Sequence, residues 1–184
     1  MEIKTDRLLL REFVEDDWRS VLPYHNNPRY LRFYPNEGEN EAEARGFVQR
    51  FLDQQAEQPR QKFQLAITLP ENGLLIGNVG LRRRGLGGHQ TGTPQGDIGY
   101  EVNPEYWGQD YATEAARAML AFGFNEIELH RIWAQCNAEN QVSRRVLEKL
   151  GMRLEGRLRQ DDFFKGRWWD DLIYAILENE WNPL

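Results

Sequence analysis

The chain has 184 residues, of which 40% are hydrophobic and 28% are charged, and its formal net charge is −6. This length fits a single domain over residues 1–184 with its own core, and the acidic balance argues against a general nucleic-acid binder. The single cysteine, Cys136, excludes an intrachain disulfide and a metal site made of several cysteines. The charged start, Met1–Arg7, and the lack of a long apolar run predict a cytoplasmic protein with no membrane partner.

The first half of the chain carries the patterns of two helices and three strands. Glu15–Asp17 supplies capping residues for the first helix, and Pro59 closes the second. The turn Pro70–Gly73 separates two stretches that alternate apolar and polar residues, which predicts a β-hairpin. In chain order, the expected elements are a strand over 7–11, a helix from Trp18, a helix over 40–58, and strands over 63–69 and 74–81.

The second half predicts strands interleaved with two helices. Gly85–Pro94 is rich in glycine and has no apolar pattern, which indicates a loop, either at the border of a substrate channel or as an ordinary hairpin connection. Gly151 fits a left-handed cap at the end of the second of these helices. The expected elements are a strand over 97–103, a helix over 110–125, a strand over 131–136, a helix over 141–150, and strands over 152–159 and 168–177. Together the two halves predict one mixed α/β domain.

The strongest functional signal lies between Gly96 and Leu154. A strand ends at Asn103-Pro104, a turn with small residues follows, and a helix begins near Asp110. The N-terminus of a helix presents free backbone N–H groups and the positive end of the helix dipole, which together bind anions. This stretch therefore predicts a site for a phosphorylated cofactor.

Four motifs, in this order and spacing, resemble the GNAT superfamily of N-acetyltransferases, and within it the RimJ/RimL-like branch. They are Tyr100-Glu101-Val102, the run Trp107–Ala115, Asn137-x-x-Asn140-x-x-Ser143 and Glu148–Gly151. The resemblance implies an α+β fold with a central, mostly antiparallel twisted sheet of about six or seven strands, a splayed parallel strand pair and about four flanking helices. It also implies acetyl transfer from acetyl-CoA to an amine by direct attack in a ternary complex, without a metal or a covalent enzyme intermediate.

The resemblance assigns cofactor binding to the end of one strand, the turn after it and two helix starts. The implied residues are Val102, Asn103, Trp107, Gly108, Gln109, Asp110, Tyr111, Ala112, Thr113, Asn137 and Asn140. The backbone N–H near Val102 is the candidate donor to the thioester oxygen. Asp110 stands where the family usually has glycine. It is either a good N-cap or a charge that repels the pyrophosphate. If it repels, exchanging Asp110 for glycine tightens acetyl-CoA binding and leaves the fold intact.

Three residues are candidates for catalysis. By resemblance, Ser143 protonates the leaving thiolate and Asn140 contacts the cofactor beside it, although both also suit a helix cap. The base that takes the ammonium proton stays open among Glu101, Asp170 and a water molecule. Period-two alternation places Glu101 and Tyr100 on opposite faces of their strand, but it leaves open which face meets the acceptor.

Other reactive and aromatic residues have structural interpretations that outweigh functional ones. Cys136 is expected to pack in the core as part of a strand rather than to act as a nucleophile. His25, His89 and His130 lack metal spacing, so no metal is expected. Phe163-Phe164 and Trp168-Trp169 fit an acceptor wall or the surface of a homodimer, while core packing is the more common use of such pairs.

Two classes of function remain open from the sequence. The first is an N-acetyltransferase that acts on a protein N-terminus, an amino acid or another small amine. The second is a non-catalytic module of the same fold that binds CoA or a protein, with Asp110 as a sign of relaxed cofactor use. Thiol release from acetyl-CoA in the presence of amines separates the two.

Overall fold

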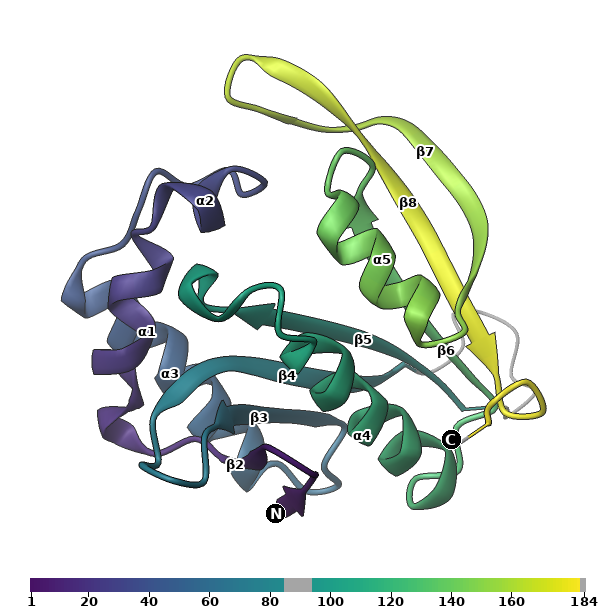
Figure 1. The fold of residues 1–184 in the computed structure, drawn as a ribbon, viewed down its shortest axis with the longest axis horizontal. Coiled ribbons are helices and arrows are strands. Elements are labelled where there is room, and N and C mark those ends of the chain that lie inside the picture. The colour runs from purple at the N-terminus through teal and green to yellow at the C-terminus, as the bar shows by residue number, and fades with distance from the viewer. Residues whose placement is uncertain (85–93, 183–184) are drawn as a thin grey trace.

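Over residues 1–84 and 94–182, which this computed structural model describes, the chain forms one eight-stranded sheet and five α-helices (Figure 1). The strands are β1 (Glu2–Lys4), β2 (Leu9–Glu12), β3 (Lys62–Thr68), β4 (Leu75–Arg84), β5 (Gln95–Val102), β6 (Arg131–Asn137), β7 (Arg153–Phe164) and β8 (Arg167–Leu177). The α-helices are α1 (Trp18–His25), α2 (Pro28–Leu31), α3 (Glu41–Ala56), α4 (Tyr111–Asn125) and α5 (Gln141–Lys149). The strand order is β1-β2-β3-β4-β5-β6-β8-β7, and β5 and β6 are its parallel pair.

The expected α+β class is confirmed, and the elements beyond the expected number are short. β1 has three residues and pairs with β2, while α2 is a single turn. Neither is long enough to show a periodic pattern of apolar residues. α2 begins at Pro28, and the preceding residue, Asn27, caps it with a side chain that accepts a hydrogen bond from the N–H of Arg29. Nearly all of the loop expected over 85–94 lies outside the described residues.

The predicted helix over 40–58 is α3, and its first turn shows why it begins where it does. The Asn40 side chain accepts a hydrogen bond from the N–H of Glu43 at 3.1 Å, and the Glu43 carboxylate accepts one from the N–H of Asn40 at 2.7 Å. This reciprocal capping box satisfies N–H groups that have no partner within the helix. The Asn40 cap therefore sets the start of α3 at Glu41, and the helix ends at Ala56, within the range predicted from its apolar spacing.

The expected splay of the parallel pair is present between β5 and β6. The two strands pair only along their first three residues, Gln95–Asp97 with Arg131–Trp133. Beyond this point β5 stays paired with β4 as far as Val102, and β6 stays paired with β8 as far as Asn137. The sheet therefore opens between β5 and β6, and Figure 1 shows α5 and the β7–β8 hairpin standing apart from β5.

The hydrophobic core is divided between the two faces of the sheet. On one face α4 packs against β4 and β5, with Met119 and Leu120 fully buried. On the other face α1 packs against α3 and β4, where Val21 and Val48 are buried. Each such side chain contributes roughly 1.5–3 kcal/mol by leaving water. Among the described residues, no helix combines the length and apolar character needed to cross a membrane.

Candidate active site

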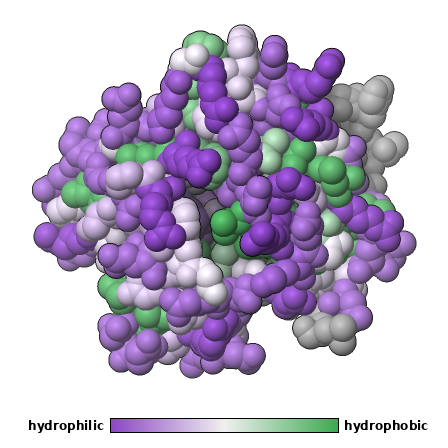
Figure 2. Space-filling view, turned by 45° about the horizontal axis from the view of Figure 1, so that its top comes forward, coloured by the Kyte–Doolittle hydropathy of each residue, from purple (hydrophilic) through white to green (hydrophobic). Residues whose placement is uncertain are grey.

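A cavity of about 950 Å³ occupies the opening between β5 and β6. Its lining comes from α2, α3, β5, β6, α5, the turn before α4 and the β7–β8 hairpin. Figure 2 shows a recess on this side of the molecule, with hydrophobic atoms inside and mostly hydrophilic residues around it. A recess of this size and mixed polarity is typical of a small-molecule site.

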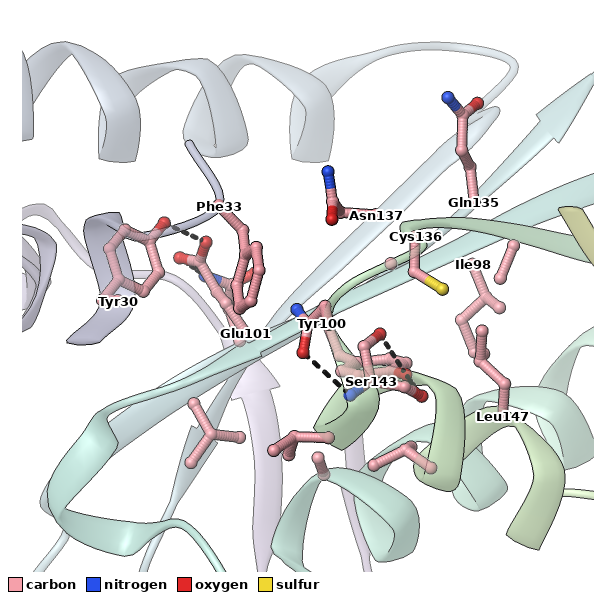
Figure 3. A pocket seen from close by; sticks show the side chains of 18 of the residues that line it. Tyr30, Phe33, Ile98, Tyr100, Glu101, Gln135, Cys136, Asn137, Ser143 and Leu147 are labelled. Carbon is pink, nitrogen blue, oxygen red and sulfur yellow. Dashed lines mark hydrogen bonds between the residues drawn. The ribbon is translucent and has the colours of Figure 1, made fainter. Parts of the chain in front are cut away.

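β5 presents one candidate residue to each face of the sheet. Glu101 points toward the helices α1 and α2, whereas Tyr100 points toward α5, where it contacts Ser143 (Figure 3). β4 and β5 lie so close together here that a Cβ on Gly77 of β4 would be 2.2 Å from the carbonyl oxygen of Glu101. Since β6 has separated from β5, both side chains line the same cavity.

The Glu101 carboxylate is the centre of a dense hydrogen-bond cluster. The Tyr30 hydroxyl donates to its Oε2 at 2.6 Å, and the Tyr24 hydroxyl donates to its Oε1 at 2.9 Å. His25 Nε2 lies 2.9 Å from Oε1, and the Asn78 amide also donates to that oxygen. The side chain of Glu101 is 12% exposed, so these groups replace most of its contact with water.

The hydrogen bonds to Glu101 decide its charge. Burial raises the pKa of this carboxyl group, but the hydrogen bond and positive charge of His25, with the Tyr30 and Tyr24 hydroxyls, bring its pKa below the ordinary value. Burial also lowers the pKa of His25, and the carboxylates of Glu101 and Glu39 more than reverse this, so its pKa is raised. Glu101 is therefore an anion at neutral pH, in a form that binds cations well.

Ser143 lies across β5 from Glu101, in the first turn of α5. Its Oγ is 3.0 Å from the Tyr100 hydroxyl, which also donates to the Ser143 carbonyl at 3.1 Å. The backbone N–H of Ser143 donates to Asn140 Oδ1 at 3.1 Å, so Asn140 is the cap of the helix. Burial raises the pKa of Tyr100, which keeps its hydroxyl protonated. The serine hydroxyl is thus held in place by a protonated tyrosine.

The backbone of β5 turns hydrogen-bonding groups toward the opening. Asn103 donates its N–H to the carbonyl of Ile76 at 2.8 Å, and bonding alternates from residue to residue along an antiparallel pair. The N–H and C=O groups of Tyr100 and Val102 therefore point away from β4. The carbonyl of Val102 accepts a hydrogen bond from Trp107 Nε1 at 2.6 Å. The backbone N–H of Val102 is directed into the opening between β5 and β6.

The turn before α4 contains two residues with left-handed backbone, Gly108 at φ 82° and Asp110 at φ 62°. Asp110 stands at the N-cap position, but its side chain makes no capping hydrogen bond. The interpretation of Asp110 as a side-chain cap is therefore wrong. Its carboxylate instead pairs with the Lys149 ammonium, near the end of α5. A left-handed conformation also explains why glycine suits this position.

The structure brings most of the predicted cofactor residues into the cavity lining. These are Val102, Trp107, Gly108, Asp110, Tyr111, Ala112, Asn137 and Asn140, together with the catalytic candidates Glu101 and Ser143. Asn103, Gln109 and Thr113 lie outside the lining. The Asn103 side chain accepts a bond from the N–H of Glu105, the Gln109 carbonyl accepts one from Arg7, and Thr113 is buried.

The other candidate base, Asp170, lies outside the cavity lining. Its carboxylate accepts hydrogen bonds from Arg157 Nε at 2.7 Å and from the N–H of Gln160 at 2.8 Å. These bonds, beginning with that of Gln160, lower the pKa of Asp170. The contacts fit a structural carboxylate on the β7–β8 hairpin.

Cys136 and the aromatic pairs have distinct environments. Cys136 is buried as expected, and burial raises its pKa to about 11. Phe164 lines the cavity and stacks on buried Trp169 at 4.8 Å. Phe163 and Trp168 are 61% and 54% exposed, so core packing is wrong for these two. A homodimer surface at this second pair stays a prediction.

Sequence reasoning missed the partners of Glu101 and Ser143. Tyr24 and His25 come from the end of α1, Tyr30 comes from α2, and Tyr100 was placed on the face opposite Glu101 without a role. One local signal was present, because four tyrosine or phenylalanine rings and a histidine occur between Tyr24 and Tyr34. Such a density of rings beside a short helix is typical of a pocket wall.

Known proteins are similar to this chain in sequence and in fold. Residues 7–153 match the family model described as Acetyltransferase (GNAT) domain. The uncharacterized N-acetyltransferase YnaD of Bacillus subtilis (strain 168) is 39% identical over 182 residues, which is 99% of this chain and 100% of that protein.

Solved structures show the same likeness. A GNAT-family acetyltransferase from Bacillus anthracis superposes with a TM-score of 0.80 at 35% identity, over 97% of this chain and 99% of that one. RimL, a ribosomal L7/L12 α-N-protein acetyltransferase solved in complex with coenzyme A, gives a TM-score of 0.80 over 96% of this chain and 98% of that one. At 19% identity, the comparison with RimL shows a shared fold alone.

Proposed function

This chain belongs to the GNAT family of acetyltransferases and uses acetyl-CoA as its co-substrate, and from this premise we propose that it acetylates a primary amine bound beside Glu101. The transfer is a direct attack within a ternary complex. The observation that carries the proposal is the placement of Glu101 and Ser143 on opposite faces of β5 within one cavity. When bound, acetyl-CoA supplies an acetyl group activated as a thioester.

The residues at the α4 end of the cavity fit a phosphorylated cofactor. The first turn of α4 contributes backbone N–H groups at Tyr111 and Ala112, which the left-handed turn before it leaves facing the lining. Lys149 and Arg145 of α5 add positive charge at the same end. These groups would hold the pyrophosphate, and the free backbone groups of β5 would hold the pantetheine as an added strand does.

The residues around Glu101 fit an ammonium. The rings that line this end of the cavity belong to Tyr30, Phe33, Tyr34, Phe47 and Phe51. A carboxylate among aromatic faces attracts a cation both by its charge and through the ring quadrupoles. The acceptor class that this supports is a primary amine with an apolar or flat body.

The cavity is bridged on the acceptor side by contacts between the β7–β8 hairpin and the end of α2. Lys165 Nζ donates to the carbonyl of Leu31 at 2.6 Å, and Phe33 meets Trp169 edge to face at 6.2 Å. The bridge favours a slender acceptor, either a small amine or an extended peptide N-terminus, over a folded surface.

The proton balance assigns roles to four residues. Between the bound ammonium and the amide product the nitrogen loses two protons, while the sulfur gains one as the C–S bond breaks, so one proton passes to solvent. Glu101 takes one proton from the ammonium, directly or through water, and passes it to solvent; it takes the second as the C–N bond forms, and the Ser143 hydroxyl gives one to the sulfur. Tyr100, 3.0 Å from Ser143 Oγ, holds the serine hydroxyl in place, and the serine regains its proton from water. The N–H of Val102 donates to the thioester oxygen as that oxygen gains charge.

Thiol release from acetyl-CoA, measured against a panel of amino acids, polyamines and short peptides with free N-termini, tests this proposal. We expect turnover with a member of the panel, and slower turnover by Glu101→Gln and, to a smaller extent, by Ser143→Ala. Glu178→Gln is the control, because Glu178 is an exposed carboxylate paired with His130. CoA binding without turnover across the panel would contradict the transfer.

A further inference from the structure

We infer that His25 and Glu39 are positioning residues that hold Glu101 as an anion toward the acceptor amine. The inference rests on the proposed function only in taking Glu101 as the group that the amine meets. His25 is the last residue of α1, and Glu39 lies just before α3. His25 contacts Glu101 directly, and Glu39 is connected to Glu101 through His25.

The geometry places an imidazole between two carboxylates. His25 Nε2 is 2.9 Å from Glu101 Oε1, and His25 Nδ1 is 2.8 Å from Glu39 Oε2. A neutral imidazole has one N–H donor, and an ionised carboxylate has none. Two hydrogen bonds along this chain therefore need a second proton, located either on the ring or on one of the carboxyl groups.

The surroundings place that second proton on the ring. Oxygens of Glu101 also accept hydrogen bonds from Tyr24, Tyr30 and Asn78, all of which favour the ionised carboxylate. The ring of Tyr30 stacks on His25 at 4.8 Å with an interplanar angle of 14°, and an aromatic face stabilises a cation. The charged and titratable groups that face His25 are Glu101, Glu39, Tyr24 and Tyr30.

The net charge of the Glu39–His25–Glu101 row explains how it would act on the acceptor. One imidazolium between two carboxylates leaves one net negative charge beside the acceptor position. His25 is 1% exposed, so its positive charge depends on Glu39 as a second partner. Without the imidazolium, Glu101 would lose the hydrogen bond and the positive charge that contribute most to keeping it ionised inside the cavity.

A purely structural role would fasten the end of α1 to the start of α3 and would affect stability alone. A positioning role also changes how Glu101 titrates and how the acceptor binds. The two roles are therefore separated by pH profiles and by the KM values of the two substrates.

The kinetic test compares His25→Gln and Glu39→Gln with the wild type. We expect His25→Gln to raise the KM for the amine by about tenfold or more, while the KM for acetyl-CoA changes less than about twofold. The acidic limb of kcat/KM for the amine should move to higher pH, because Glu101 then protonates more readily. Glu39→Gln should give a smaller shift in the same direction.

His130→Gln is the matched control for the kinetic test. Its ring also contacts a carboxylate, with Nδ1 2.9 Å from Glu178 Oε1, but this exposed pair lies outside the cavity lining. It should leave both KM values and the pH profile unchanged. An unchanged amine KM and pH profile in folded His25→Gln would overturn the inference.

The charge of His25 can also be measured directly by NMR, without turnover and without substitutions around Glu101. The chain has three histidines, so nitrogen and carbon NMR of the imidazoles in the wild-type protein can be assigned with His89→Gln and His130→Gln. We expect His25 to remain doubly protonated at about pH 7.5, above the ordinary histidine value of roughly 6.5. A neutral His25 there would overturn the inference and leave the proposed function intact. A charged His25 with no turnover on any amine would count against the proposed function alone.

Discussion

The two faces of β5 contribute to the cavity by different physical means. On the face of Glu101, side chains from α1, α2 and β4 converge on one carboxylate that is 12% exposed. On the face of Tyr100, backbone groups at the start of α4 and along β5 combine with exposed charges such as the pair of Asp110 and Lys149. Binding at the first face depends on buried charge, and binding at the second depends mainly on backbone geometry.

This difference predicts how each face responds to substitution. Electrostatic interactions are several times stronger among buried groups than at the surface, where water and salt screen them. The Asp110 side chain is 60% exposed, so its effects should be modest and sensitive to salt. Single changes should therefore have their largest effects at Glu101, smaller ones at Ser143 and the smallest at the α4 turn and at Cys136.

Glu101→Gln should have the largest effect. The amide keeps the size of the side chain but loses its negative charge and its capacity to accept a proton. We expect kcat/KM for the amine to fall by about 10²-fold or more, the range of general-base contributions, with acetyl-CoA binding nearly unchanged. Initial rates and calorimetry with acetyl-CoA measure the two effects separately. A fall of less than about threefold in a folded variant would remove Glu101 from the mechanism.

Ser143→Ala should lower kcat by about tenfold, because a thiolate is a modest base and needs limited help from an acid. Tyr100→Phe should have a similar effect, since its hydroxyl lies 3.0 Å from Ser143 Oγ. The double variant should be little worse than either single variant, because the two hydroxyls act as one unit. Fully additive losses would show that they act independently.

Asp110→Gly should tighten acetyl-CoA binding by about three- to tenfold. Glycine removes a negative charge near the pyrophosphate position, frees Lys149 to pair with phosphate, and suits the left-handed backbone. Calorimetry at low and high salt checks this, and the gain should shrink as salt increases. Lys149→Ala should weaken binding and serves as the opposing change. Equal or weaker binding by Asp110→Gly, with unchanged melting, rules out charge repulsion.

Cys136→Ala should have the smallest effect, with kcat within about twofold of the wild type. The raised pKa of about 11 keeps the thiol protonated at neutral pH, and a protonated thiol is a poor nucleophile. Initial rates of the variant and the sensitivity of the wild type to a thiol-alkylating reagent measure this. Rapid inactivation of the wild type, absent in the variant, would instead give Cys136 a role at the site.

The turn and helix start that we propose for cofactor binding were predictable as local structure because their groups are close together in the sequence. The strand end at Val102, the turn and the start of α4 occupy one continuous stretch, so residue types and spacing were enough to locate them. The failure there was Asp110, where capping preference predicted a side-chain hydrogen bond. The left-handed backbone turned that side chain toward Lys149 instead.

By itself, the sequence determined the mixed α/β class and the long elements with their helical and strand periods, and it placed Asn140 and Ser143 at the start of one helix. These follow from local rules, since period, capping and turn preference act over a few residues. Only the tertiary structure decided that Glu101 is the buried anion and Asp170 a structural carboxylate. The physical reason is that charge state depends on burial and on partners such as His25, which is 76 residues away along the chain.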